Sequence, residues 1–163
     1  MPWEEKAGTI LWSYYAGMES GTALAGILTG RINPSGKLAE TFPRVYEDTP
    51  TGHNGQFGRD DMVCYEEEIM VGYRHYEKND ILPMFCFGHG LSYTEFAYHD
   101  LQVKQDNDAK DRVSISFDIE NVGQIDGREI VQIYVRDEEC TVIRPEKELK
   151  AFKSITLKAG SIC

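Results

Sequence analysis

The chain has 163 residues, of which 41% are hydrophobic and 27% charged, a composition typical of globular proteins. This length fits one domain or parts of two. Seventeen Lys and Arg residues against 27 Asp and Glu residues give a net charge of −10. Electrostatic repulsion therefore disfavours nucleic acid and anionic lipid as partners. Because no apolar run reaches about 18 residues, we expect no membrane-spanning helix.

Neither the cysteines nor the glycines form a motif that would bind a metal or a nucleotide cofactor. The sequence has four cysteines, with no C-x-x-C pair and no Cys/His cluster at metal-ligand spacing. We expect free thiols and no metal. The glycines match neither G-x-G-x-x-G nor a P-loop, and we expect no cofactor. No serine lies in a G-x-S-x-G elbow, so the sequence does not support a hydrolase triad. The sequence does not decide the cellular compartment of the protein, and we favour the cytoplasm.

The first part of the chain predicts a strand, a helix and a strand. Residues 9–15 form an apolar and aromatic run typical of a strand buried on both faces. Leu24, Ile27 and Leu28 then follow helical spacing, with Ser20 as a possible N-cap and Gly30 as a left-handed stop. Residues 33–36 favour a β-turn, and residues 37–43 predict a short strand. This βαβ unit is too small to be a domain.

The middle of the chain predicts no regular structure. Residues 47–62 are rich in Gly, Asp, Thr and Asn and lack periodicity, which is typical of a surface loop. Residues 65–76 and 83–93 are rich in aromatic side chains. We interpret both as extended segments packed against a larger body.

From Phe96 onward the pattern changes to strands. Residues 113–120 and 131–136 alternate apolar and polar side chains, and residues 149–157 predict a further strand. This predicts an antiparallel β-sandwich, but only about four strands fit where about seven are typical. The fold class is therefore α+β by fragment: a partial βαβ sandwich remnant and then an incomplete β-sandwich. We place the boundaries at 1–46, 47–95 and 96–163.

The carboxylates and histidines suggest chemistry only weakly. Glu66, Glu67 and Glu68 could supply a hydrolase pair, but adjacent residues of a strand point to opposite faces, and a solvated strand edge explains them as well. His89 is expected to be a packing residue, and His53 lies in the predicted loop. We predict no catalytic residue within the chain and keep Glu67 and His53 as candidates for substrate binding.

Four stretches together resemble the C-terminal part of glycoside hydrolase family 3, the β-glucosidase family. They are residues 16–25 with Asn33-Pro34-Ser35-Gly36-Lys37-Leu38, residues 65–67 with 71–76, residues 83–85 with 87–94, and residues 121–123 with 127–135 and 144–150. The resemblance implies a structural role for a set of motif residues. These are Glu19, Asn33, Gly36, Tyr73, Arg74, Gly88, His89, Gly90, Asn121, Gly123 and Glu129. Glu68 departs from the pattern, since the family usually has Gly there.

The resemblance also implies an architecture and a reaction. The family has a (β/α)8 barrel, an α/β-sandwich domain and a fibronectin type III-like domain. It hydrolyses terminal β-D-glycosides with retention, through an Asp nucleophile and a Glu acid/base. The motifs that carry these two carboxylates would lie upstream of Met1. The chain would then comprise the end of the sandwich domain, a linker and a truncated fibronectin-like domain.

Three functions follow as hypotheses. The chain is a fragment of an exo-acting β-glucosidase, inactive alone, whose partners are the missing barrel domain and a β-linked glycoside. Alternatively, it is a non-catalytic module that binds carbohydrate or protein. In the third hypothesis, a separate barrel-bearing chain docks on it. Sugar specificity is left open.

Overall fold

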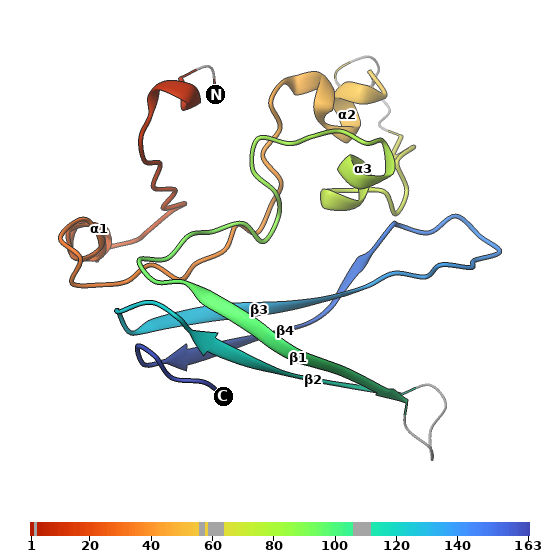
Figure 1. Ribbon diagram of the computed structural model, residues 1–163. Helices are drawn as coiled ribbons and strands as arrows, with labels where there is room; N and C mark the ends of the chain where they lie inside the picture. The colour runs from red at the N-terminus through yellow and green to blue at the C-terminus, as the bar shows by residue number, and fades with distance from the viewer. Residues whose placement is uncertain (2, 56–57, 59–63, 106–111) are drawn as a thin grey trace. The chain divides into compact units, whose positions relative to one another are not determined.

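The computed structural model describes residues 1, 3–55, 58, 64–105 and 112–163 (Figure 1). These residues form two compact units, which we describe separately. The first unit contains Met1–Leu24, Lys37–His89 and Gln132–Phe152, and the second contains Ala25–Gly36, Gly90–Val131 and Lys153–Cys163. The predicted loop 47–62 includes residues 56, 57 and 59–62, which lie outside the described residues.

Helix α1, Ser20–Leu28, confirms the predicted helix, and Gly30 ends it with a φ of 74°. Its start differs by one residue. The carbonyl of Glu19 accepts the first helical hydrogen bond, from the Ala23 N–H at 2.9 Å, so Glu19 and not Ser20 holds the cap position. The predicted apolar stripe is not buried, since Leu28 is 70% exposed.

The two strands predicted beside α1 were wrong as a pair. In the described residues, 9–15 belong to no strand, and residues 38–42 instead bond the backbone of residues 84–89. Phe42 forms an antiparallel bridge with Phe85, and Leu38 exchanges hydrogen bonds with Gly88 and His89, each 2.8 Å long. A parallel strand needs a neighbour to satisfy its backbone groups, and the described residues give 9–15 none.

The rest of the first unit contains short helices (Figure 1). They are the 3-10 turns Glu4–Lys6 and Tyr46–Asp48 and the helices α2, Pro50–His53, and α3, Tyr73–Lys78. Thr49 caps α2 by accepting a hydrogen bond from the Gly52 N–H at 3.1 Å. The prediction of an extended segment over 65–76 was wrong in two places. α3 occupies its end, and residues 65–70 form tight turns.

Four strands follow Phe96 in the described residues, as predicted: β1, Phe96–Gln105; β2, Val113–Asn121; β3, Gly127–Val135; and β4, Glu148–Leu157. β1 pairs with β2 antiparallel, and β3 pairs with β4 in a second two-stranded sheet. The β1–β2 register shifts between His99 and Gln102, where Asp100 has a φ of 53°. Among the described residues, no helix is long and apolar enough to cross a bilayer.

The core of the second unit is small. Ile119 of β2, Val131 of β3 and Leu157 of β4 are buried together, and Phe96, Phe117 and Ile155 pack around them. The alternating pattern of β2 puts Phe117 and Ile119 on one face, but the same face is exposed at its start, where Val113 is 56% exposed. The strands are thus held mainly at one end.

Candidate functional site

Helix α3 contacts the segment before β4 and the start of that strand through three polar side chains. The Arg74 guanidinium lies 3.0 Å from the Glu148 carboxylate, and the Lys147 ammonium lies 2.7 Å from Glu77 Oε1. The Tyr73 hydroxyl accepts a hydrogen bond from the Leu149 N–H at 2.9 Å. Residues 147–149 therefore hold three residues of α3. The paired residues are 70 or more positions apart in the sequence, so no local pattern reveals the contact.

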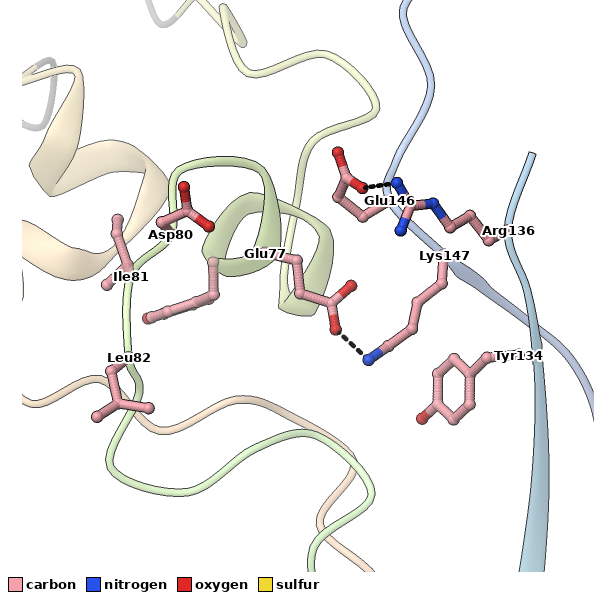
Figure 2. A pocket seen from close by; sticks show the side chains of 9 residues that line it. Glu77, Asp80, Ile81, Leu82, Tyr134, Arg136, Glu146 and Lys147 are labelled. Atoms are coloured by element: carbon pink, nitrogen blue, oxygen red, sulfur yellow. Dashed lines mark ion pairs between the residues drawn. The ribbon is translucent and has the colours of Figure 1, made fainter. Parts of the chain in front are cut away.

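A cavity of about 540 Å³ lies beside this contact (Figure 2). The end of α3 and the turn after it supply one side, with Tyr76, Glu77 and Asp80. Figure 2 shows Glu77 reaching toward Lys147, on the side formed by β3 and the segment before β4. This cavity is open to solvent over much of its extent.

The opposite side of the cavity carries two cations and an aromatic ring. The Arg136 guanidinium lies 3.4 Å from the Glu146 carboxylate. The Lys147 ammonium lies 5.5 Å from the centroid of the Tyr134 ring. Burial raises the pKa of the Tyr134 hydroxyl, which donates a 2.7 Å hydrogen bond to Gln132.

His75 forms a second cluster in the same unit, at the opposite face of α3. It is 3% exposed, with Nε2 at 3.1 Å from the carbonyl of Asp48 and Nδ1 at 3.2 Å from the amide of Asn79. Burial is the largest cause that lowers its pKa, and the charge of His53 adds to it. The carbonyl bond to Asp48 and the charges of Glu67 and Asp48 oppose the shift.

Both predicted substrate-binding residues lie near this histidine. His53 ends α2, and its ring meets the His75 ring edge to face, with centroids 5.4 Å apart. Glu67 lies half-buried in the turn before α3. The expectation that Glu67 and Glu68 alternate along a strand was wrong, because Glu68 has a φ of 49° in that turn. Their role in substrate binding stays a prediction.

The motif residues of the second unit hold loops through hydrogen bonds. Asn33 accepts from the Ser92 hydroxyl and the Tyr93 N–H, both at 2.8 Å, and donates to the carbonyl of Asp126 at 3.1 Å. Glu129 accepts from the Tyr98 hydroxyl at 3.4 Å. Burial, with the charge of Glu129, raises the pKa of Tyr98 to about 12.

Asn121 is fully buried and connects more groups than any of these. Its Oδ1 accepts from the Thr94 hydroxyl at 2.6 Å and the Gly123 N–H at 3.2 Å. Its Nδ2 donates to the carbonyls of Ile125 and Leu157, at 2.9 and 3.3 Å. This one side chain thus fixes the turn after β2 and the end of β4.

The motif residues of the first unit pack closely. Gly88 has a φ of 80°, and a Cβ there would overlap the Gln132 side chain, whose Nε2 donates to the Gly88 carbonyl at 3.1 Å. The His89 ring stacks on Phe85, with centroids 5.5 Å apart. Gly36, a motif residue of the second unit, shows no such constraint, since a Cβ there would meet no atom within 4 Å.

No motif of the sequence identifies the cavity residues Glu77, Arg136 and Lys147. The expectation of an extended segment over 65–76 conceals the helical spacing that puts Arg74 and Glu77 on one face. The alternating charges of residues 144–148 were a second signal, because they fit cations and carboxylates facing a charged helix.

Two family profiles match the chain. The profile described as "Glycosyl hydrolase family 3 C-terminal domain" matches residues 1–93, and the one described as "Fibronectin type III-like domain" matches residues 129–162. Residues 94–128 lie between the two matched ranges.

Similar proteins and solved structures agree with these profiles. The chain is 48% identical over 161 residues to thermostable beta-glucosidase B of Acetivibrio thermocellus, covering 98% of this chain and 21% of that protein. It also matches the solved structure of beta-glucosidase 3B from Thermotoga neapolitana in complex with alpha-D-glucose, at 41% identity and a TM-score of 0.90, over 99% of this chain and 22% of that one. The beta-glucosidase of Bifidobacterium adolescentis gives a TM-score of 0.93 at 37% identity, over 99% and 24% of the two chains. The chain thus spans about a fifth of the length of the curated relatives that it matches.

Proposed function

This chain belongs to glycosyl hydrolase family 3, as the C-terminal portion of a β-glucosidase of that family, and we propose that it is the scaffold part of an exo-acting, retaining enzyme. The observation that carries the proposal is the match over 98% of this chain to a β-glucosidase of which it covers only 21%. In this proposal the Asp nucleophile and the Glu acid/base lie upstream, and the chain alone does not hydrolyse glycosides. The substrate of the whole enzyme is a terminal β-D-glycoside.

The domain boundaries are part of the proposal. We assign residues 1–46 to the end of the α/β-sandwich domain, 47–95 to a linker and 96–163 to the start of the fibronectin-like domain. The hydrogen bonds of β1, which begins at Phe96, support the last boundary. The linker carries α2 and α3, which explains why it contains buried residues such as Tyr76.

The rest of the enzyme is the proposed partner of residues 11–18. In this stretch Trp12 is 48% exposed, Tyr15 fully exposed and Met18 98% exposed. Exposing large apolar side chains such as these to water has a high cost in free energy. A partner that covers this surface gains much hydrophobic free energy, and we propose that it is the barrel-bearing part.

An activity assay tests the proposal. The purified 163-residue chain and the product of the same gene extended at its 5′ side are each given an aryl β-glucoside. We expect turnover from the extended protein and none above buffer from the chain. Turnover by the chain that Glu67→Gln abolishes, with Glu66→Gln as control, would show that the chain has its own site and overturn the proposal.

A further inference from the structure

A buried histidine connects two short elements of the first unit to α3. His75 of α3 is buried, and its Nε2 lies 3.1 Å from the carbonyl of Asp48, which ends the 3-10 turn Tyr46–Asp48. The His53 ring, at the end of α2, meets the His75 ring edge to face. One imidazole therefore contacts both elements of residues 46–53, which we call the 46–53 segment (Figure 1).

Little apolar packing holds the 46–53 segment in place. None of its residues is buried in the part of the chain that the structure describes. Its local hydrogen bonds include the Thr49 cap of α2 and the Asp48 carboxylate, which accepts from the Arg44 and Val45 N–H groups, both at 3.1 Å. Helices of one turn are unstable alone, so the order of this segment depends on its contact with α3.

The contacts of His75 fit only a neutral ring. The Asp48 carbonyl accepts from Nε2–H, so Nδ1 carries no proton and accepts from the Asn79 amide at 3.2 Å. The same amide nitrogen donates to the His75 carbonyl at 2.9 Å, so turning the amide would set its oxygen against that carbonyl. A proton on Nδ1 would therefore face a second donor in a buried position, which is unfavourable.

Charged groups from the elements around the ring act on its protonation. His53 of α2 disfavours a second positive charge, whereas Asp48 and Glu67, the latter in the turn before α3, favour one. The Tyr76 ring of α3 lies edge to face against the imidazole, with centroids 5.5 Å apart. Burial outweighs the two carboxylates and lowers the pKa of His75, so the ring binds a proton more tightly once it is exposed to water.

We propose that His75 is a pH-sensitive latch, which holds the 46–53 segment on α3 while its ring is neutral and releases the segment when the ring is protonated. The release is local, because the core around Ile119 in the second unit takes no part in these contacts. It carries His53, a candidate for substrate binding, away from α3. The latch does not rest on the proposed hydrolysis.

Hydrogen–deuterium exchange of the purified 163-residue chain at pH 7.5, 6.5 and 5.5, corrected for the intrinsic exchange rate, tests the latch. The amides of His53 and Asn54, which donate to carbonyls within the segment, report on α2. We expect their protection to fall about threefold to tenfold between pH 7.5 and 5.5, because a released ring with an ordinary pKa near 6.5 binds the proton more tightly. The amide of Ile119 should change less than about twofold, since burial of its core is independent of His75.

Three outcomes of this measurement would overturn the latch. One is equal protection of the 46–53 segment at all three pH values. Another is a loss of protection that appears to the same extent at Ile119. The third is a segment without protection at pH 7.5, since a neutral His75 would then hold nothing.

Asn79→Asp distinguishes the latch from a merely structural contact. Its carboxylate would accept from a protonated Nδ1, so the segment should be protected at least as well at pH 5.5 as at pH 7.5. His75→Gln, which has no titrating ring, should change less than about twofold between these pH values and serves if Asn79→Asp does not fold. His99→Gln is the control and should keep the wild-type profile, because His99 lies on β1 beside Glu120. A wild-type profile in Asn79→Asp or His75→Gln would refute the latch.

Discussion

Glu68 holds a left-handed backbone conformation, with a φ of 49°, in the turn that precedes α3. Residues with a Cβ pay about 1–2 kcal/mol for this conformation, and glycine does not. Glycine lowers stability by about 0.5–1 kcal/mol through its freedom in the unfolded chain. We therefore expect Glu68→Gly to stabilise the chain, by up to about 1 kcal/mol, measured as a higher urea midpoint at unchanged m-value.

Glu66→Gly is the control for this change, since Glu66 has no positive φ. It should lower stability or leave it unchanged. A lower midpoint for Glu68→Gly would show that the turn does not store strain.

His75 makes stability depend on pH. Its two ring nitrogens bond a carbonyl and an amide N–H, an arrangement that fits only the neutral ring with the proton on Nε2. Burial lowers its pKa below the ordinary 6.5, so the unfolded chain binds this proton more tightly. The contribution of the neutral ring is fully present above pH 6.5 and is lost as the pH falls through the lower folded pKa.

We expect the free energy of unfolding to fall between pH 7.5 and 5, with a His75 contribution of at most about 1.4 kcal/mol per pH unit. Urea unfolding of the wild-type chain and of His75→Gln at several pH values isolates it. His99→Gln is the control, because His99 lies exposed beside Glu120. Equal pH slopes for the wild-type chain and His75→Gln would contradict the assignment.

At the scale of the element, the end of β2 is held by the hydrogen bonds of the Asn121 side chain rather than by apolar packing. Its amide bonds four groups from the segments before β1, after β2 and at the end of β4. Asn121→Ala would leave the Leu157 carbonyl and the Thr94 hydroxyl buried without these partners. We expect a loss of about 3 kcal/mol or more, since each orphaned group costs about 1–3 kcal/mol.

Thermal or urea unfolding measures this loss. Gln124→Ala changes an exposed amide in the same turn and should cost less than about 0.5 kcal/mol. A loss for Asn121→Ala no larger than that of the control would mean that water replaces the missing amide.

The elements that the sequence predicts well are those whose pattern is local. The alternation around Phe117 and Ile119 identifies β2, and the spacing up to Gly30 identifies α1, because one face or one stop residue decides each. Residues 9–15 and α3 depend on partners far along the chain. The Tyr73 hydroxyl holds Leu149, and no window of ten residues contains both.

The candidate site was hidden for the same reason. Glu77 and Lys147 are 2.7 Å apart in space but 70 residues apart in sequence, and neither lies in a catalytic motif. The family resemblance, by contrast, can be recognised from the sequence because it depends on residue order, and the match to a β-glucosidase over 98% of the chain confirms it.

At the scale of the whole molecule, exposed apolar side chains favour self-association of the chain, whereas its large net charge disfavours it. Trp12, Tyr15 and Met18 expose apolar surface that drives association, and the net charge of −10 repels like chains. Salt screens the repulsion and leaves the hydrophobic attraction in place, since the Debye length falls from about 10 Å at 0.1 M to about 3 Å at 1 M. We therefore expect the purified chain to self-associate more at 1 M than at 0.1 M NaCl.

Light scattering after size-exclusion chromatography gives the mass at each salt concentration. The double variant Tyr15→Ser/Met18→Ser should shift the association to at least fivefold higher protein concentration, because it removes two of the most exposed apolar side chains. Leu101→Ser, at a single exposed position of β1, should shift it less than twofold. If residues 11–18 are the surface that the barrel-bearing part covers, the extended protein stays monomeric under the same conditions and is indifferent to salt. A chain that is monomeric at both salt concentrations would instead mean that its apolar side chains are too scattered to bind a partner.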